Sequence, residues 1–203
     1  MKNLSGLVEQ ATAGDTRAFC ALVRRFQDFA VAYARALLPV REEAEAAAGD
    51  AFLAAWKTLH ELKEPLAFPS WLRALVYTQC QRRTRRTVPR TESKSRTPLE
   101  AMLETERRNL VWGAVDGLPP NQREALITFY MGGHDLTATG KFLSVPAKTV
   151  KSRLDQAHAA LPVPLLELVK NTLHDERPSR MTDFENRVTR LLQAATGGDS
   201  ASA

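Results

Sequence analysis

The chain has 203 residues, a length that allows one large domain or two small ones, and its formal net charge is +5. Hydrophobic residues make up 44% and charged residues 25%, a balance that excludes a largely disordered chain. No apolar run reaches the roughly 18 residues that span a membrane, and the start lacks the apolar core of a secretion signal, so we expect a cytoplasmic protein without membrane insertion.

Residue usage predicts an all-α fold and no enzyme chemistry. Ala, Leu, Glu and Arg are frequent, while β-branched and aromatic residues are sparse. Cys20 and Cys80 lie far apart, without the close spacing of a metal site, and the four histidines are scattered. Because no glycine-rich phosphate loop or nucleophile motif is present, we expect no catalytic residues, no metal and no cofactor.

The first third of the chain predicts helices with apolar stripes. Residues 4–13 form a short expected helix, which Gly14 stops before Asp15 caps the next one. From Phe19 to Leu37 apolar residues recur at spacings of three and four, which predicts a long amphipathic helix that ends before Pro39.

An acidic helix is predicted over residues 41–62. Glu42, Glu43, Glu45 and Asp50 lie largely away from its apolar side, and its first turns are acidic, which suits the positive end of the helix dipole. These acids either stabilise the helix start or form a docking surface for a basic partner. The charge pattern alone leaves both interpretations open.

A third helix begins near Pro69 and becomes strongly basic. Trp71 and Tyr77 precede the basic stretch, and glutamines are interleaved with it. Aromatic side chains can stack on unpaired bases while arginines contact the phosphates, so we favour nucleic-acid contact over a solvated helix end. The cations are Arg73, Arg82, Arg83, Arg85, Arg86, Arg90, Lys94 and Arg96, with Glu92 as the one acid among them.

The polar stretch 87–97 predicts a linker, and Pro98 starts a helix that continues to about Asp116. Residues 118–161 then predict a helix, a short helix, a turn and another helix, which is typical of a helix-turn-helix unit. On its last helix Val150, Leu154 and Ala157 should face inward. The outward face then presents a basic, hydroxyl-rich surface suited to the major groove of DNA: Lys148, Thr149, Lys151, Ser152 and Arg153.

Residues 162–203 predict two further amphipathic helices. Pro162 and Pro164 interrupt the preceding helix, and Thr182 and Glu185 form an expected capping box for the last one. We expect this extension either to pack on the preceding domain or to cover a surface that binds DNA or a protein partner.

Two separate sets of motifs resemble the extracytoplasmic-function (ECF) group of RNA polymerase sigma factors. The runs GDTRAFCALVRRFQDFAVAYARALL, DAFLAAW and FPSWLRALVYTQCQRR are similar to the family's region 2, and LPPNQREALITFY and FLSVPAKTVKSRL to its region 4. The match extends from Gly14 to Leu161. It implies a region 2-like helical domain at 1–86, a linker at 87–97, a region 4-like helix-turn-helix domain at 98–161 and a C-terminal extension at 162–203.

The resemblance implies a factor that binds core RNA polymerase and directs promoter-specific initiation, with promoter DNA as its second partner. An anti-sigma factor or another regulator remains open as a third partner. The positions that the resemblance implies for contact with polymerase are Glu43, Glu45, Asp50 and Trp56. Those for the minus-10 element are Phe68, Trp71, Arg73, Tyr77, Gln79, Arg82 and Arg83, and those for the minus-35 element are Lys148, Thr149, Lys151, Ser152 and Arg153.

The chain departs from the family pattern at two places. Residues 46–49 read Ala-Ala-Ala-Gly where an acid and an amide usually help to hold polymerase. In the turn unit, Thr139 replaces a large aliphatic residue, Gly140 an alanine and Ser144 a glycine. We expect a buried, unpartnered Thr139 hydroxyl to cost about 1–3 kcal/mol.

The first departure keeps a second function open, a sigma-like adaptor or decoy that binds polymerase or a regulator without initiating transcription. A self-sufficient repressor would need dimer symmetry to contact two half-sites. No long heptad segment provides that symmetry.

Overall fold

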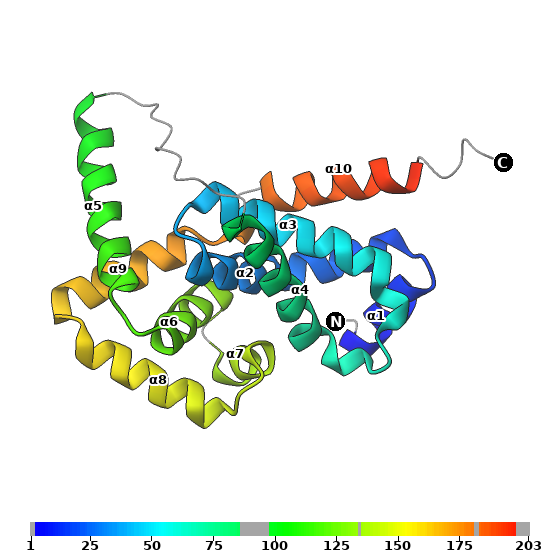
Figure 1. Cartoon of the computed structure of the whole chain (residues 1–203), viewed down its shortest axis with the longest axis horizontal. Coiled ribbons are helices and arrows are strands. Elements are labelled where there is room, and N and C mark those ends of the chain that lie inside the picture. Colours follow the sequence, from blue (N-terminus) through cyan, green and yellow to red (C-terminus); the bar gives the residue numbers. More distant parts are fainter. Residues whose placement is uncertain (1–2, 86–97, 134, 181–182, 198–203) are drawn as a thin grey trace.

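The computed structural model describes residues 3–85, 98–133, 135–180 and 183–197 (Figure 1). Within these ranges the chain contains helices and no strand, which confirms the all-α prediction. None of the described helices is both long enough and apolar enough to cross a membrane. The elements are α1 (Leu4–Thr12), α2 (Thr16–Leu37), α3 (Arg41–Thr58), η1 (Leu59–Glu61), η2 (Pro65–Ala67), α4 (Phe68–Thr84), α5 (Pro98–Asp116), α6 (Pro120–Gly132), α7 (Leu136–Leu143), α8 (Ala147–Ala160), α9 (Val163–Asp175), η3 (Pro178–Arg180) and α10 (Asp183–Gly197).

Helix α2 lies at the centre of the fold. Gly14 has a positive φ of 93°, and the Asp15 side chain accepts hydrogen bonds from the amides of Arg17 and Ala18, so the predicted stop and cap are both present. The apolar stripe of α2 is buried, and helices α1, α3 and α4 pack around it. Phe26 of α2 lies with its ring centroid 5.4 Å from that of Phe68 at the start of α4.

Helix α6 packs against α2, and α7 packs against α4, so residues of both halves share one apolar core. The Phe142 ring of α7 stacks on Phe29 of α2 at 5.4 Å between centroids. The Arg35 guanidinium of α2 lies 3.7 Å from the centroid of the Trp112 ring of α5. An arginine held over an indole face is a favourable contact, and here it joins the two halves.

The predicted turn unit is formed by α7, a short turn and α8. The Asp135 side chain caps α7 by accepting hydrogen bonds from the amides of Thr137 and Ala138. Ser144 ends α7 in the left-handed conformation, with φ 60°. The amide of Val145 then donates to the Gly140 carbonyl oxygen at 2.9 Å, which closes the turn before α8.

The C-terminal helices contact both halves of the molecule. Helix α9 lies against α5 and α6, and α10 runs along α3 and also contacts α2 (Figure 1). The helix predicted over residues 41–62 ends as an α-helix at Thr58 and continues as the 3-10 turn η1. The predicted linker and Thr182 of the predicted capping box lie outside the described residues.

Candidate functional site

The first turns of α4 are packed into the core rather than presented to solvent. Phe68 is fully buried, and its ring centroid lies 6.0 Å from that of the half-buried Trp71. Arg73 donates to the Tyr33 hydroxyl at 3.1 Å, which holds its side chain against α2. This part of α4 is ordered by its neighbours, and Phe68 lies beneath the surface.

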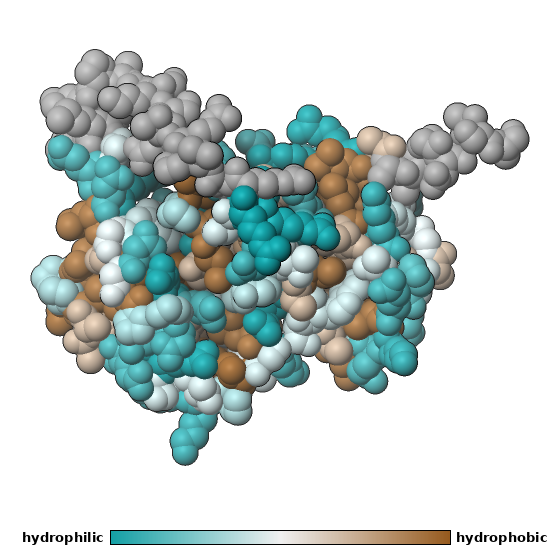
Figure 2. Space-filling view, in the orientation of Figure 1, coloured by the Kyte–Doolittle hydropathy of each residue, from teal (hydrophilic) through white to brown (hydrophobic). Residues whose placement is uncertain are grey.

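The C-terminal end of α4 forms an exposed cationic surface. Tyr77 is 46% exposed, Arg82 and Arg85 are exposed, and Gln79 and Arg83 are half-buried. Figure 2 shows a hydrophilic patch over this end of the helix. The arrangement places an aromatic ring and several cations on one short helix, which suits contact with an unpaired strand.

One ion pair joins two predicted surfaces. Arg83, expected at DNA, donates to the Asp50 carboxylate of α3, expected at polymerase, with 2.6 Å between the atoms. Both side chains remain partly exposed, at 31% and 46%. The two predicted sites therefore meet at the α3–α4 contact.

The acidic face of α3 is partly covered. Both carboxylate oxygens of Glu45 accept hydrogen bonds, Oε1 from Arg41 at 2.8 Å and Oε2 from Arg187 of α10 at 2.7 Å. Burial acts to raise the pKa of Glu45, but the two arginines outweigh it and hold this pKa below its usual range. Glu43 is half-buried, and the half-buried Trp56 lies edge-on to Phe19 at 5.1 Å.

Helix α8 separates apolar and polar side chains as predicted. Val150, Leu154 and Ala157 are buried, which confirms the inward face. The outward residues differ in exposure: Lys148, Lys151 and Ser152 are exposed, and Thr149 and Arg153 are half-buried. The surface over α8 is mainly hydrophilic in Figure 2.

Charged residues of α8 interact within the helix and with α6. Lys151 pairs with Asp155 one turn along at 2.8 Å, which holds the ammonium group along the helix. Burial raises the pKa of Glu124 on α6, and the positive charge of Arg153 acts in the opposite direction.

Sequence reasoning missed the contacts that α10 makes with α2 and α3. Glu185 is expected only as part of a capping box, and no local signal marks Arg187, because their partners Arg24 and Glu45 lie more than a hundred residues away. Only the amphipathic pattern of the last helix signalled that one of its sides is buried. Among the described residues, no group of three or more His, Cys, Asp or Glu side chains could hold a metal ion.

Comparison with known sequences gives a consistent picture. Residues 22–89 match the family described as sigma-70 region 2. The ECF RNA polymerase sigma factor SigM of Mycobacterium tuberculosis is 32% identical over 162 residues, covering 76% of this chain and 81% of the relative. The ECF RNA polymerase sigma-E factor of Escherichia coli is 26% identical over 173 residues, covering 76% of this chain and 90% of the relative.

A solved structure has a similar fold. CnrH, in complex with the cytosolic domain of CnrY, aligns with a TM-score of 0.56 and 23% sequence identity, covering 83% of this chain and 97% of that chain. At this identity the likeness concerns the arrangement of helices alone.

Proposed function

This chain belongs to the ECF group of RNA polymerase sigma factors and has their role in transcription initiation, and from this premise we propose that it binds core RNA polymerase and directs initiation at a promoter with two elements. The proposal retains the division into 1–86, 87–97, 98–161 and 162–203. No chemical step is assigned to the protein itself.

The observation that supports the proposal best is the presence of two cationic helical surfaces on separate sets of helices. The outward face of α8 carries Lys148, Lys151 and Arg153, and the C-terminal end of α4 carries Arg82 and Arg83. A repressor with one helix-turn-helix has no need of the second surface. A factor that contacts two promoter elements uses both.

Each surface suits a different form of DNA. Helix α8 has the polar outward face and apolar inward face of a helix that enters the major groove, so we assign it to the minus-35 duplex. Tyr77, Gln79 and the arginines of α4 suit a melted strand, so we assign them to the minus-10 element. Phe68, buried beneath Trp71, supports that surface by packing.

The polymerase contact is assigned to α3. Glu43, Glu45, Asp50 and Trp56 all lie on this helix, and Asp50 retains 46% side-chain exposure although it pairs with Arg83. An acidic helix surface attracts a basic patch on a partner and steers the encounter.

The test is run-off transcription with purified core polymerase on genomic DNA fragments. We expect at least one specific transcript that is absent when the protein is omitted. A protein that binds polymerase and yields no specific transcript on any fragment supports the second function, an adaptor or decoy. The departure at Ala46 to Gly49 is the feature that favours this alternative.

A matched pair of variants tests the minus-35 assignment. Lys151→Ala or Arg153→Ala should weaken initiation mainly from templates with the preferred minus-35 sequence, because base contacts discriminate among sequences. Equal losses on every template would assign both side chains to phosphate contact alone. Arg190→Ala, at an exposed position on α10, provides a control of the same charge change.

A further inference from the structure

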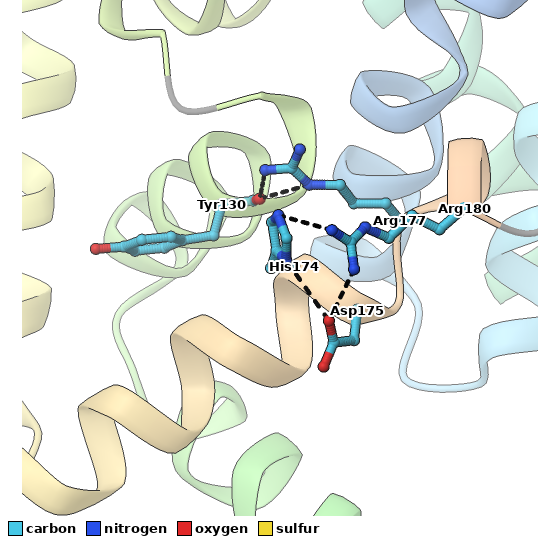
Figure 3. Close-up of polar contacts among 5 residues, drawn as sticks. All are labelled: Tyr130, His174, Asp175, Arg177 and Arg180. Atoms are coloured by element: carbon cyan, nitrogen blue, oxygen red, sulfur yellow. Dashed lines mark hydrogen bonds and ion pairs between the residues drawn. The ribbon is translucent and has the colours of Figure 1, made fainter.

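The end of α9 is anchored to the second half of the molecule. The Arg177 guanidinium donates two hydrogen bonds to the carbonyl oxygen of Tyr130 in α6, at 3.1 and 2.7 Å (Figure 3). The nearly buried Glu176 carboxylate lies 3.3 Å from the Arg108 guanidinium of α5. Two arginine contacts thus hold this end of α9 against α5 and α6.

The chain then crosses to the first half through η3. Arg180 contacts His174 and Asp175 at 3.3 and 3.1 Å, which ties η3 back to α9 (Figure 3). Ser179 donates from its amide and its hydroxyl to the two carboxylate oxygens of Asp28 in α2, at 2.8 and 2.6 Å. These contacts direct the following helix, α10, along α2 and α3.

Helix α10 buries its apolar side against α3. Phe184, Val188 and Leu192 are each no more than 2% exposed, and the Phe184 ring centroid lies 6.1 Å from that of Phe52. A β-carbon on Gly49 would lie 4.0 Å from a Val188 methyl group, so α10 passes directly over the small residues of α3. The departure from the family pattern at Gly49 therefore coincides with the place where α10 packs.

Charged pairs flank this apolar contact. Arg187 of α10 binds Glu45 at 2.7 Å, and Glu185 binds Arg24 of α2 at 2.6 Å. With Arg41 on its other oxygen, the Glu45 side chain is only 18% exposed. Both carboxylate oxygens of Glu45 are therefore already bound by arginines while α10 is in place.

We propose that α10 is an intramolecular ligand of α3 that competes with core RNA polymerase for the same surface. The inference rests on the proposed function, which assigns Glu45 to the polymerase contact. A tethered helix has a high effective concentration at its own binding surface, so it lowers the affinity of any competitor for that surface. Polymerase binding then displaces α10, and conditions that favour docked α10 reduce transcription.

A cysteine pair can lock α10 in place reversibly. The Cys20 sulfur of α2 lies 3.6 Å from the Thr189 hydroxyl oxygen of α10, so Thr189→Cys brings two sulfurs close enough to form a disulfide after small rotations. Oxidation of this full-length variant should lower its affinity for core polymerase at least ten-fold, and reduction should restore it. The double variant Cys20→Ser, Thr189→Cys, treated in the same way, should show no such change.

A charge swap tests whether weaker docking of α10 raises the affinity for polymerase. Glu185→Arg places two like charges together and should raise polymerase affinity by roughly two- to five-fold, the range expected for an exposed pair. Adding Arg24→Glu restores an opposite-charge pair and should return the affinity to that of the natural chain. Neither residue belongs to the proposed polymerase-binding set.

The outcomes separate this inference from the proposed function. Equal affinity of the oxidised and reduced Thr189→Cys protein overturns the inference and leaves the proposed function intact. If the natural chain binds weakly but Val188→Asp, which places a carboxylate in the α3–α10 contact, binds well, the inference is supported. If no form binds core polymerase, the proposed function fails and the inference fails with it.

Discussion

Thr139 and Gly140 of α7 and Ser144, which ends that helix, depart from the family pattern, and each has its own structural setting. Thr139 is fully buried, and its hydroxyl oxygen has no hydrogen-bond partner among the described residues. A β-carbon on Gly140 would lie 2.6 Å from the Val145 carbonyl oxygen, so alanine does not fit there without movement of the turn. Ser144 adopts the left-handed conformation in place of the usual glycine. The turn keeps its shape because Gly140 allows the close approach of Val145.

Thr139→Val should stabilise the protein by about 1 kcal/mol, because it replaces a buried unpaired hydroxyl with a methyl group. The free energy of unfolding in urea measures the effect. A decrease in stability would mean that the hydroxyl finds a partner in solution.

Gly140→Ala should destabilise the protein by about 1–3 kcal/mol, since the added methyl group would meet backbone rather than a flexible side chain. Gly6→Ala is the control, because a β-carbon there has no neighbour within 4 Å. The control should gain about 1 kcal/mol from better helix propensity. Equal unfolding midpoints for the two variants would contradict the tight turn.

At the scale of the element, α4 has two different ends. Its first turns are fixed by Phe68 packing and by the hydrogen bond from Arg73 to Tyr33. Its last turns present Arg82 to solvent, whereas Arg83 is bound by Asp50. Arg82 is therefore more accessible to a phosphate group than the adjacent Arg83.

Arg82→Ala should weaken promoter DNA binding. It should also make the slope of log affinity against log salt concentration shallower, by roughly 0.9 if the lost phosphate contact is on duplex DNA and by roughly 0.7 if it is on a single strand. Arg83→Ala should reduce the slope less, because Asp50 competes with phosphate for this side chain. Titrations at several salt concentrations measure both slopes. An unchanged slope for Arg82→Ala would leave this end of α4 as solvated surface.

At the scale of the whole molecule, helices from both predicted domains form one core. One close approach is between α2 and α6, where a β-carbon on Gly132 would lie 2.4 Å from a ring carbon of Phe29. Phe29 in turn stacks on Phe142 of α7. The contact between the halves is strengthened by the Arg35–Trp112 pair. It is also strengthened by the hydrogen bonds that Arg177 and Ser179 donate to Tyr130 of α6 and Asp28 of α2.

Gly132→Ala should lower the free energy of unfolding by about 1–3 kcal/mol, because the added methyl group would meet the Phe29 ring in the shared core. Unfolding in urea measures the effect. Gly113→Ala on α5, where a β-carbon has no neighbour within 4 Å, should not lower the free energy of unfolding. Equal free energies of unfolding for the two variants would show that the core does not depend on this close approach.

Local sequence signals determined the helices and the two cationic surfaces. Asp15 and the prolines mark helix starts, and the apolar stripes of α2 and α8 identify their buried faces, because capping and burial depend on residues a few positions apart. The family likewise followed from motifs within single helices.

Only the tertiary structure decided how the helices lie against one another. Contacts such as Arg187 with Glu45, Val188 with Gly49 and Arg35 with Trp112 join residues that are far apart in the chain, and no local pattern specifies them. The same holds for the covered state of Glu45 and the burial of Phe68, which depend on neighbouring helices. The physical reason is that residue type and periodicity determine which side of a helix is buried, whereas the partner that buries it is chosen by packing across the whole chain.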